Sequence, residues 1–96
     1  MKVVWDEAKS RSNWKKHGVT FAEAAELLDT DETRLDIFDE EHSAQEARFI
    51  SIGPVRRGLV LVVWTERDDA QVRLISARWA TVRERDLYQS YFGSTG

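Results

Sequence analysis

Apolar positions recur along this chain with two different spacings, which indicate where helices and strands lie. Residues 2–5, KVVW, are short, β-branched and aromatic, and they predict a strand. Asp6 is a suitable cap for a helix that runs to His17, with Gly18 in the left-handed conformation after its end. Thr20 caps a second helix, and Glu23 would complete its capping box. The apolar stripe of that helix consists of Phe21, Ala24, Ala25 and Leu28.

The rest of the chain predicts four strands and a last helix. Segments 33–39, 46–53 and 72–79 alternate between apolar and polar positions, as strands with one exposed face do. Residues 59–64, LVLVVW, are continuously apolar, which favours a central strand that is covered on both faces. The capping box TVRE at 81–84 then begins a helix.

The predicted order is therefore β-α-α-β-β-β-β-α, which is typical of an α+β domain. Consecutive hairpin-like connections favour an antiparallel sheet, and the helices are expected to cover one of its faces. A chain of 96 residues has one core, so we expect a single domain over 1–93 and a frayed end at 94–96. The chain has no cysteine, no apolar signal region near its start and no apolar run of membrane-spanning length. We therefore expect a cytoplasmic protein that does not associate with membranes.

Charged residues are unevenly distributed along the chain, which bears on whether it binds nucleic acid. The net charge of −3 argues against a non-specific nucleic-acid binder, since such proteins are usually basic. However, segment 23–46 holds ten acidic residues and a single arginine, whereas segment 48–85 holds eight arginines and four acidic residues. We expect a dipolar surface, and we expect segment 23–46 to avoid RNA because like charge repels phosphate.

The candidate chemistry rests on arginines in or beside strands. The chain has no glycine-rich phosphate loop, no GxSxG or HExxH motif and no acidic cluster at metal-ligand spacing, so neither a metal nor a cofactor is expected. Plain alternation within 72–79 assigns Arg73 and Arg78 to opposite faces. Two interpretations remain open. The arginines form cross-strand pairs with acids, each stabilising the sheet by roughly 0.2–1 kcal/mol, or they form a face that binds a phosphodiester.

The second interpretation suits metal-free cleavage of RNA. A base removes the proton of the ribose 2′-hydroxyl, cations stabilise the charge that builds on phosphorus, and an acid protonates the leaving 5′-oxygen. Glu46 or His17 is the candidate base. The groups that would supply positive charge are Arg48, Arg67, Arg78 and Lys16.

The end of the first predicted helix holds further candidates. At helical spacing Lys9, Asn13, Lys16 and His17 fall on one polar face. Cations in the last turn also complement the helix dipole, which explains Lys16 and His17 without any function. The dipole does not explain Asn13, so this polar face is a candidate contact for RNA.

Four segments together resemble the BrnT family, the ribonuclease toxins of BrnT/BrnA type II toxin–antitoxin modules. The resemblance implies a RelE-like fold, an endoribonuclease that inhibits translation, and a BrnA-type antitoxin that binds DNA. It also implies that operator DNA is contacted only through the antitoxin and that the toxin dimerises within the complex. The segments are WDEAKSRSNWKKHGVTFAEA (5–24), DEEHSAQEARFISIG (39–53), VVWTERDD (62–69) and VRLISARWATVRERDLY (72–88).

The resemblance also implies roles for the residues that match the family's motifs. Arg48, Arg67 and Arg78 are expected to bind phosphate and to stabilise the negative charge of the transition state. Arg73 is expected to bind RNA. Glu46 is the expected base, with Lys16 or His17 as the supporting cation or proton donor. Two tryptophans depart from the pattern: Trp64 precedes TER, where relatives often have histidine, and Trp79 follows SAR, where a basic residue is frequent. The alternative is therefore a catalytically weakened homologue that binds the antitoxin and takes part in operon autoregulation.

Overall fold

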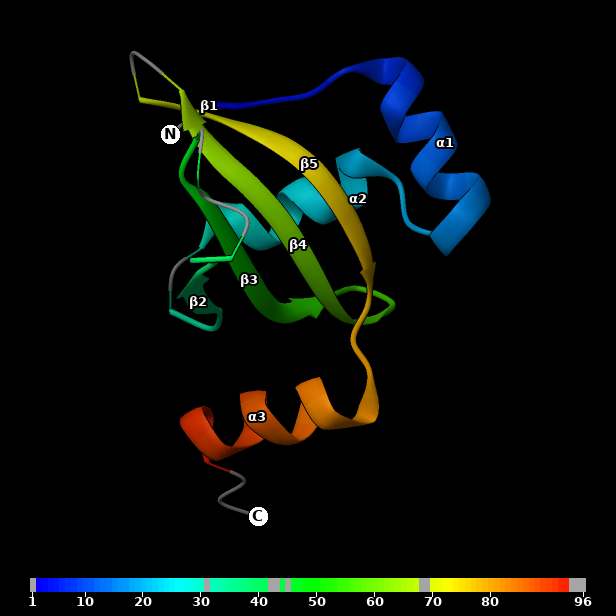
Figure 1. The fold of residues 1–96 in the computed structure, drawn as a ribbon. Coiled ribbons are helices and arrows are strands. Elements are labelled where there is room, and N and C mark those ends of the chain that lie inside the picture. Colours follow the sequence, from blue (N-terminus) through cyan, green and yellow to red (C-terminus); the bar gives the residue numbers. More distant parts are fainter. Residues whose placement is uncertain (1, 31, 42–43, 45, 68–69, 94–96) are drawn as a thin grey trace.

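A computed structural model describes residues 2–30, 32–41, 44, 46–67 and 70–93 of the chain. The fold is α+β, and a short 3-10 helix, η1, is added to the predicted series of elements (Figure 1). The predicted frayed segment 94–96 lies outside the described residues. The elements are β1 (Lys2–Val4), α1 (Glu7–His17), α2 (Phe21–Ala25), η1 (Glu26–Asp29), β2 (Leu35–Phe38), β3 (Arg48–Val55), β4 (Gly58–Arg67), β5 (Gln71–Trp79) and α3 (Val82–Phe92).

The five strands form one mixed sheet in the order β1-β5-β4-β3-β2. Strands β2 to β5 are antiparallel as predicted, and β4 is central. The prediction of a purely antiparallel sheet is wrong for β1, which pairs parallel with β5 from Lys2↔Gln71 to Val4↔Arg73. Hairpin connections fix the direction of consecutive strands only. They contain no information about β1, whose neighbour in the sheet is the last strand of the chain.

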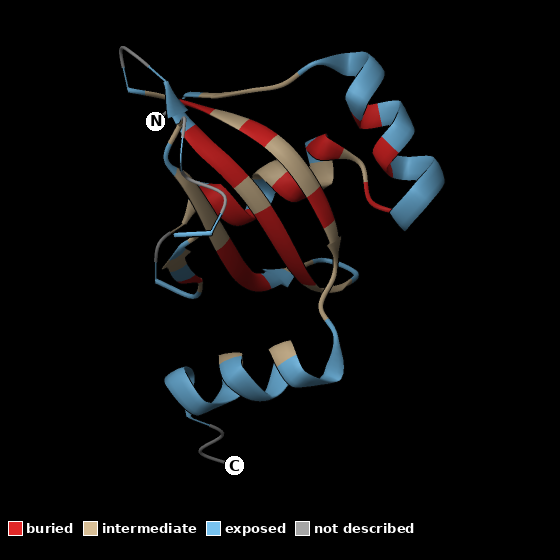
Figure 2. Ribbon diagram, viewed as in Figure 1, coloured by how far each residue is buried: buried red, intermediate tan, exposed pale blue. Residues whose placement is uncertain are grey.

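One face of the sheet is covered by α2 and η1, which lie behind the strands in Figure 1. We call it the helix-covered face; on β4 it carries Val60, Val62 and Trp64, and we call the other side, which carries Leu61, Val63 and Thr65, the open face. Buried residues of α2, η1 and the helix-covered face form one core, and Figure 2 colours the buried residues red. That core includes Phe21, Ala24, Leu27, Val60, Val62, Leu74 and Ala77.

The last helix departs from the prediction that all helices share one face. On the open face Leu35, Ile52 and Leu61 are buried although they lie outside the core beneath α2. Helix α3 packs against this end of the sheet, where Tyr88 Oη donates to Thr33 O at 2.6 Å. Because only Ala80 and Thr81 separate α3 from β5, the chain cannot return to the helix-covered face. Of the helices in the described ranges, α3 is the one that packs on the open face, and it reaches only this end of it.

The predicted helix ends are confirmed with one difference. Asp6 accepts from the backbone N–H groups of Ala8 and Lys9, and Gly18 has the left-handed φ of 71°. Thr81 and Glu84 form a complete capping box at the start of α3. At α2 the Thr20 side chain accepts from Glu23 N at 3.1 Å, but the Glu23 carboxylate binds Arg57 instead of closing the box.

Candidate functional site

A β-bulge in β5 decides which cations share a face. Thr65 pairs with Arg73 and Trp64 with Leu74, but Val63 pairs with Ser76, which leaves Ile75 as an extra residue. Directly paired residues point to the same side of a sheet, and an inserted residue shifts the alternation by one position. Arg73 and Arg78 therefore both point to the open face. The prediction that they lie on opposite faces is wrong because regular alternation does not hold across a bulge.

Two of these arginines belong to one row of the sheet, which we call the arginine row: Arg48, Thr65 and Arg73. Arg48 on β3 pairs with Thr65 on β4, and Thr65 pairs with Arg73 on β5. Neighbouring strands lie about 4.8 Å apart, so the backbones of the two arginines are separated by about 10 Å. Thr65 is buried between them. The row thus holds two arginines on the same side of the sheet, with one strand between them.

Glu46 lies at the edge of this row. Its Oε1 accepts a hydrogen bond from Arg73 Nη2 at 3.1 Å, and both side chains are partly exposed. The hydroxyl of Thr65 donates to Ala47 O at 2.6 Å, which ties the segment before β3 to the central strand. A carboxylate is thereby held beside Arg73 at the edge of the row. The buried Nε of Arg73 has no hydrogen-bond partner among the described residues.

Arg67 and Arg78 share the open face but lie at different ends of it. Arg67 is the exposed last residue of β4, two positions beyond Thr65. Arg78 pairs with Leu61, which is four positions from Thr65 and therefore about 13 Å away along the strand. The predicted arginines are consequently brought to one face, but they do not meet at one point.

Arg78 is also bound to a carboxylate of α3. Its Nη1 and Nη2 donate to Glu84 Oε1 and Oε2 at 2.8 and 2.7 Å. These hydrogen bonds lower the pKa of Glu84 to about 2 and raise the pKa of Arg78. This pair joins a strand to a helix, and Arg73–Glu46 joins β5 to the segment before β3, so these arginines pair with acids but not across neighbouring strands as expected. In the chain on its own, Arg78 is therefore a link between β5 and α3.

Ion pairs also join the acidic and basic segments of the chain. Glu23 and Glu26 of the acidic segment bind Arg57 and Arg56 in the turn between β3 and β4. The hydrogen bonds to Arg57 lower the pKa of Glu23. Charges that are segregated in the sequence are thus partly paired in space, away from the arginine row.

Asn13 does not occupy the exposed polar face that helical spacing predicted. It is buried, its Nδ2 donates to Val19 O and Ala77 O at 2.8 Å each, and its Oδ1 accepts from Ala77 N at 3.2 Å. Because β1 ends at Val4, no strand of the described residues pairs with the edge of β5 near Ala77. The side-chain amide of Asn13 bonds to the backbone of Ala77 there instead. Both donors of its side-chain amide are engaged by backbone carbonyls, which leaves none for RNA.

Lys16 and His17 are exposed at the C-terminal end of α1. Within the described part of the chain, neither side chain forms an ion pair or hydrogen bond with Glu46 or the arginine row. Their position suits the dipole of α1. The structure does not bring them together with the other predicted site residues.

Both unusual tryptophans lie on the helix-covered face. Trp64 is 5% exposed, stacks on Phe49 at 4.7 Å and donates from Nε1 to Ser51 Oγ at 2.8 Å. Trp79 pairs with Val60, and the guanidinium of Arg57 lies 5.1 Å from the centre of its ring. Neither tryptophan lies on the face of the arginine row, although Trp64 lines a pocket together with Arg67.

Sequence reasoning missed Thr65 and Glu84. Thr65 holds the centre of the row, but a threonine within an apolar strand shows no signal of its own. Glu84 was recognised as part of a capping box, and its second role at Arg78 depends on where α3 packs.

No helix in the described ranges is both long and apolar enough to cross a membrane. Among the same residues, no group of three or more histidine, cysteine, aspartate or glutamate side chains could hold a metal ion.

Comparisons with known proteins agree with this architecture. A family model described as "Ribonuclease toxin, BrnT, of type II toxin-antitoxin system" matches residues 5–84. The fold is similar to the crystal structure of the Brucella abortus ribonuclease toxin, BrnT, with a TM-score of 0.64 and 25% sequence identity. That similarity covers 84% of this chain and 97% of the Brucella chain. A search of curated proteins finds no match.

Proposed function

Because the chain belongs to the BrnT family of ribonuclease toxins of type II toxin–antitoxin systems, we propose that it is a metal-independent endoribonuclease acting on its open face. Cleavage of RNA would inhibit translation, and an antitoxin of the BrnA type would neutralise it. In the same proposal the fold is RelE-like and the protein is cytoplasmic. The toxin dimerises within the complex, which contacts operator DNA only through the antitoxin.

The observation that carries this proposal is the arginine row with Glu46 at its edge. Arg48 and Arg73 flank Thr65, and Glu46 lies 3.1 Å from Arg73. A guanidinium matches two phosphate oxygens at once, so the row suits a phosphodiester. A carboxylate oxygen within reach of the substrate can act as a general base.

The reaction then needs few parts. Glu46 takes the proton of the 2′-hydroxyl, and the 2′-oxygen attacks phosphorus while Arg48 and Arg73 stabilise the developing charge. The bond to the 5′-oxygen breaks, which leaves a cyclic 2′,3′-phosphate and a 5′-hydroxyl. Because Lys16 and His17 lie at the end of α1, we assign the proton of the leaving oxygen to solvent. DNA lacks the 2′-hydroxyl and should remain intact.

The outer arginines would extend this site along the RNA. Arg67 ends β4 on the same face as the row. Arg78, at the other end of that face, would contact a neighbouring phosphate if the phosphate displaces Glu84, which lies 2.7 Å from it. We therefore assign the reacting phosphate to Arg48 and Arg73, and neighbouring phosphates to Arg67 and Arg78.

A cleavage assay with matched variants tests the proposal. Glu46→Gln and Arg73→Ala should each lower the rate of RNA cleavage by roughly 10²–10³-fold, as expected for a base and a charge-stabilising group. Arg83→Ala is the control, because Arg83 is an exposed arginine of α3. EDTA should leave the wild-type rate unchanged, and a loss of activity in EDTA would contradict the metal-free mechanism.

The second candidate function is a non-catalytic module that only binds antitoxin and regulates its operon. The observation that favours it is that Arg73 and Arg78 each pair with a carboxylate in the chain on its own. Expression of the chain alone in bacteria separates the two. Growth arrest with RNA decay that disappears in Arg73→Ala supports the nuclease. Normal growth and intact RNA, despite soluble protein, support the binding module.

A further inference from the structure

Helix α1 is attached to the fold by polar groups. Its buried residues are Ser10 and Asn13. Ser10 Oγ accepts from Phe21 N at 2.9 Å, and Asn13 binds the backbone of Val19 and Ala77. Trp14, the only large apolar residue of the helix, remains 49% exposed. A surface helix normally buries its apolar side against the core, whereas the ring of Trp14 stays half-exposed, with the guanidinium of Arg57 5.7 Å from its centre.

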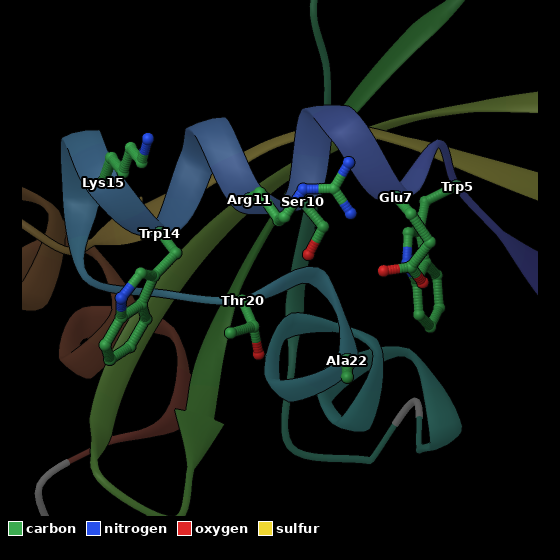
Figure 3. A pocket seen from close by; sticks show the side chains of 8 residues that line it. All are labelled: Trp5, Glu7, Ser10, Arg11, Trp14, Lys15, Thr20 and Ala22. Carbon is green, nitrogen blue, oxygen red and sulfur yellow. The ribbon is translucent and has the colours of Figure 1, made fainter.

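A groove lies beside Trp14, between α1 and the start of α2. Its volume is about 500 Å³. Trp5 and Trp14 stand at its two ends, with Ala22 of α2 on the opposite wall (Figure 3). Trp5 is oriented by a hydrogen bond from its Nε1 to Glu7 Oε1 at 2.9 Å. Because α1 is held at defined backbone positions, this groove is formed before any partner arrives, which lowers the entropic cost of binding.

The lining of the groove holds two cations and one acid, Glu7, whose carboxylate is bound to Trp5, although the whole chain carries −3. Arg11 and Lys15 line it from α1. No acid within the described ranges forms an ion pair with either of them. Apolar walls between two tryptophans suit a bulky apolar side chain, and the cations beside them suit carboxylates. An acidic amphipathic helix combines both features and fits a groove by this recognition mode.

We infer that this groove seats the antitoxin through an acidic amphipathic helix, which inserts a bulky apolar side chain between Trp5 and Trp14. The inference rests on the proposed function for the existence of that antitoxin. RNA fits the groove less well, because the walls are largely apolar and the arginine row lies on the open face of the sheet. The anchor for the antitoxin is thus separate from the residues proposed to cleave RNA.

Titration calorimetry of the purified chain with the full-length antitoxin encoded beside it tests this inference. Trp14→Ala, and the double charge reversal Arg11→Glu with Lys15→Glu, should each raise the dissociation constant by roughly 30-fold or more, as removal of a central interface residue does. Tyr91→Ala and Arg83→Glu are the controls on α3, where Tyr91 is 69% exposed. They should bind like wild type. Cleavage of RNA by Trp14→Ala alone should match wild type.

Hydrogen exchange on the wild-type complex needs no variant and covers the case in which a variant fails to fold. Antitoxin should protect the amides of 10–22 more than those of Val82–Phe92. Unchanged affinity of both groove variants, or protection confined to α3, overturns the inference. A groove variant that binds antitoxin normally but has lost affinity for RNA also overturns it. The same holds for a groove variant whose one effect is to separate a dimer of this chain into monomers. Antitoxin binding is measured without cleavage, so a chain that binds through the groove but does not cleave RNA refutes the proposed function alone.

Discussion

Arg73 and Arg78 point to the same side of the sheet because Ile75 is inserted between them in β5. In a regular strand, residues five positions apart point to opposite sides. The bulge brings Arg78 to the open face and returns Ala77 to the core beneath the helices. β-bulges commonly redirect side chains next to functional sites. Both the packing of β5 and the composition of the open face depend on this one extra residue.

Deletion of Ile75 should therefore be far more damaging than its truncation. A regular β5 would turn residues 76–79 over and direct Arg78 into the core, where an unpaired charge costs about 3–5 kcal/mol. Ile75→Ala keeps the extra residue of the bulge and removes most of a half-buried side chain. It should therefore lower the free energy of unfolding by about 1 kcal/mol. Urea unfolding measures both. Equal free energies of unfolding for the deletion and the substitution would contradict this account of β5.

The bulge also shows what the sequence does and does not predict. Helix ends follow from local chemistry, so Asp6, Gly18 and the Thr81–Glu84 box were predicted correctly. The direction of β1 depends on a strand at the other end of the chain, and the position of a bulge depends on how two strands fit together. Neither has a local signal.

The same limit applies to the candidate site. Strand alternation correctly placed Arg48 with Ile50 and Ile52, since β3 pairs regularly with β4. The spacing in α1 placed Asn13 on a polar face, which was wrong because that side of the helix meets the unpaired edge of β5. A short polar side chain suits both solvent and a buried backbone, and only the packing of α1 decides between them.

Asn13→Ala should destabilise the protein without altering the chemistry of cleavage. The substitution leaves the backbone groups of Val19 and Ala77 without the partner they have now. Buried groups left unsatisfied cost about 1–3 kcal/mol each, and we expect a total of about 3 kcal/mol. Urea unfolding should show this loss, whereas Ser12→Ala, an exposed neighbour, should stay within about 0.5 kcal/mol of wild type. Loss of cleavage in folded Asn13→Ala, with unchanged stability, would instead return Asn13 to the RNA site.

The Arg78–Glu84 pair should make stability depend on acidity. The hydrogen bonds from Arg78 lower the pKa of Glu84 from 4.5 to about 2 in the folded chain. A lowered pKa means that the stabilisation is complete above pH 4.5 and is lost as the pH falls toward 2. Solvent screens the pair, so its contribution is about 1 kcal/mol.

Melting temperatures between pH 6 and 2.5 measure this contribution. Wild type should be more stable than Glu84→Gln at pH 6, and the difference should shrink as the pH falls. Asp86→Asn is the control, at an exposed position of the same helix. The difference in melting temperature between this variant and wild type should not shrink as the pH falls. A constant difference between wild type and Glu84→Gln over the whole range would show that the ion pair does not stabilise α3.

Trp64→His, which introduces the residue that the family resemblance led us to expect, should lower stability without raising the rate of RNA cleavage. Trp64 is 5% exposed on the helix-covered face, where it stacks on Phe49 and binds Ser51. A smaller, more polar imidazole there should cost about 3 kcal/mol. Val63→His is the matched control, because the neighbouring residue is half-buried and points to the open face, and it should cost less. Urea unfolding and a cleavage assay on both variants give the comparison. If Trp64→His cleaves RNA faster than wild type, catalysis uses the helix-covered face. The arginine row would then not be the site of cleavage.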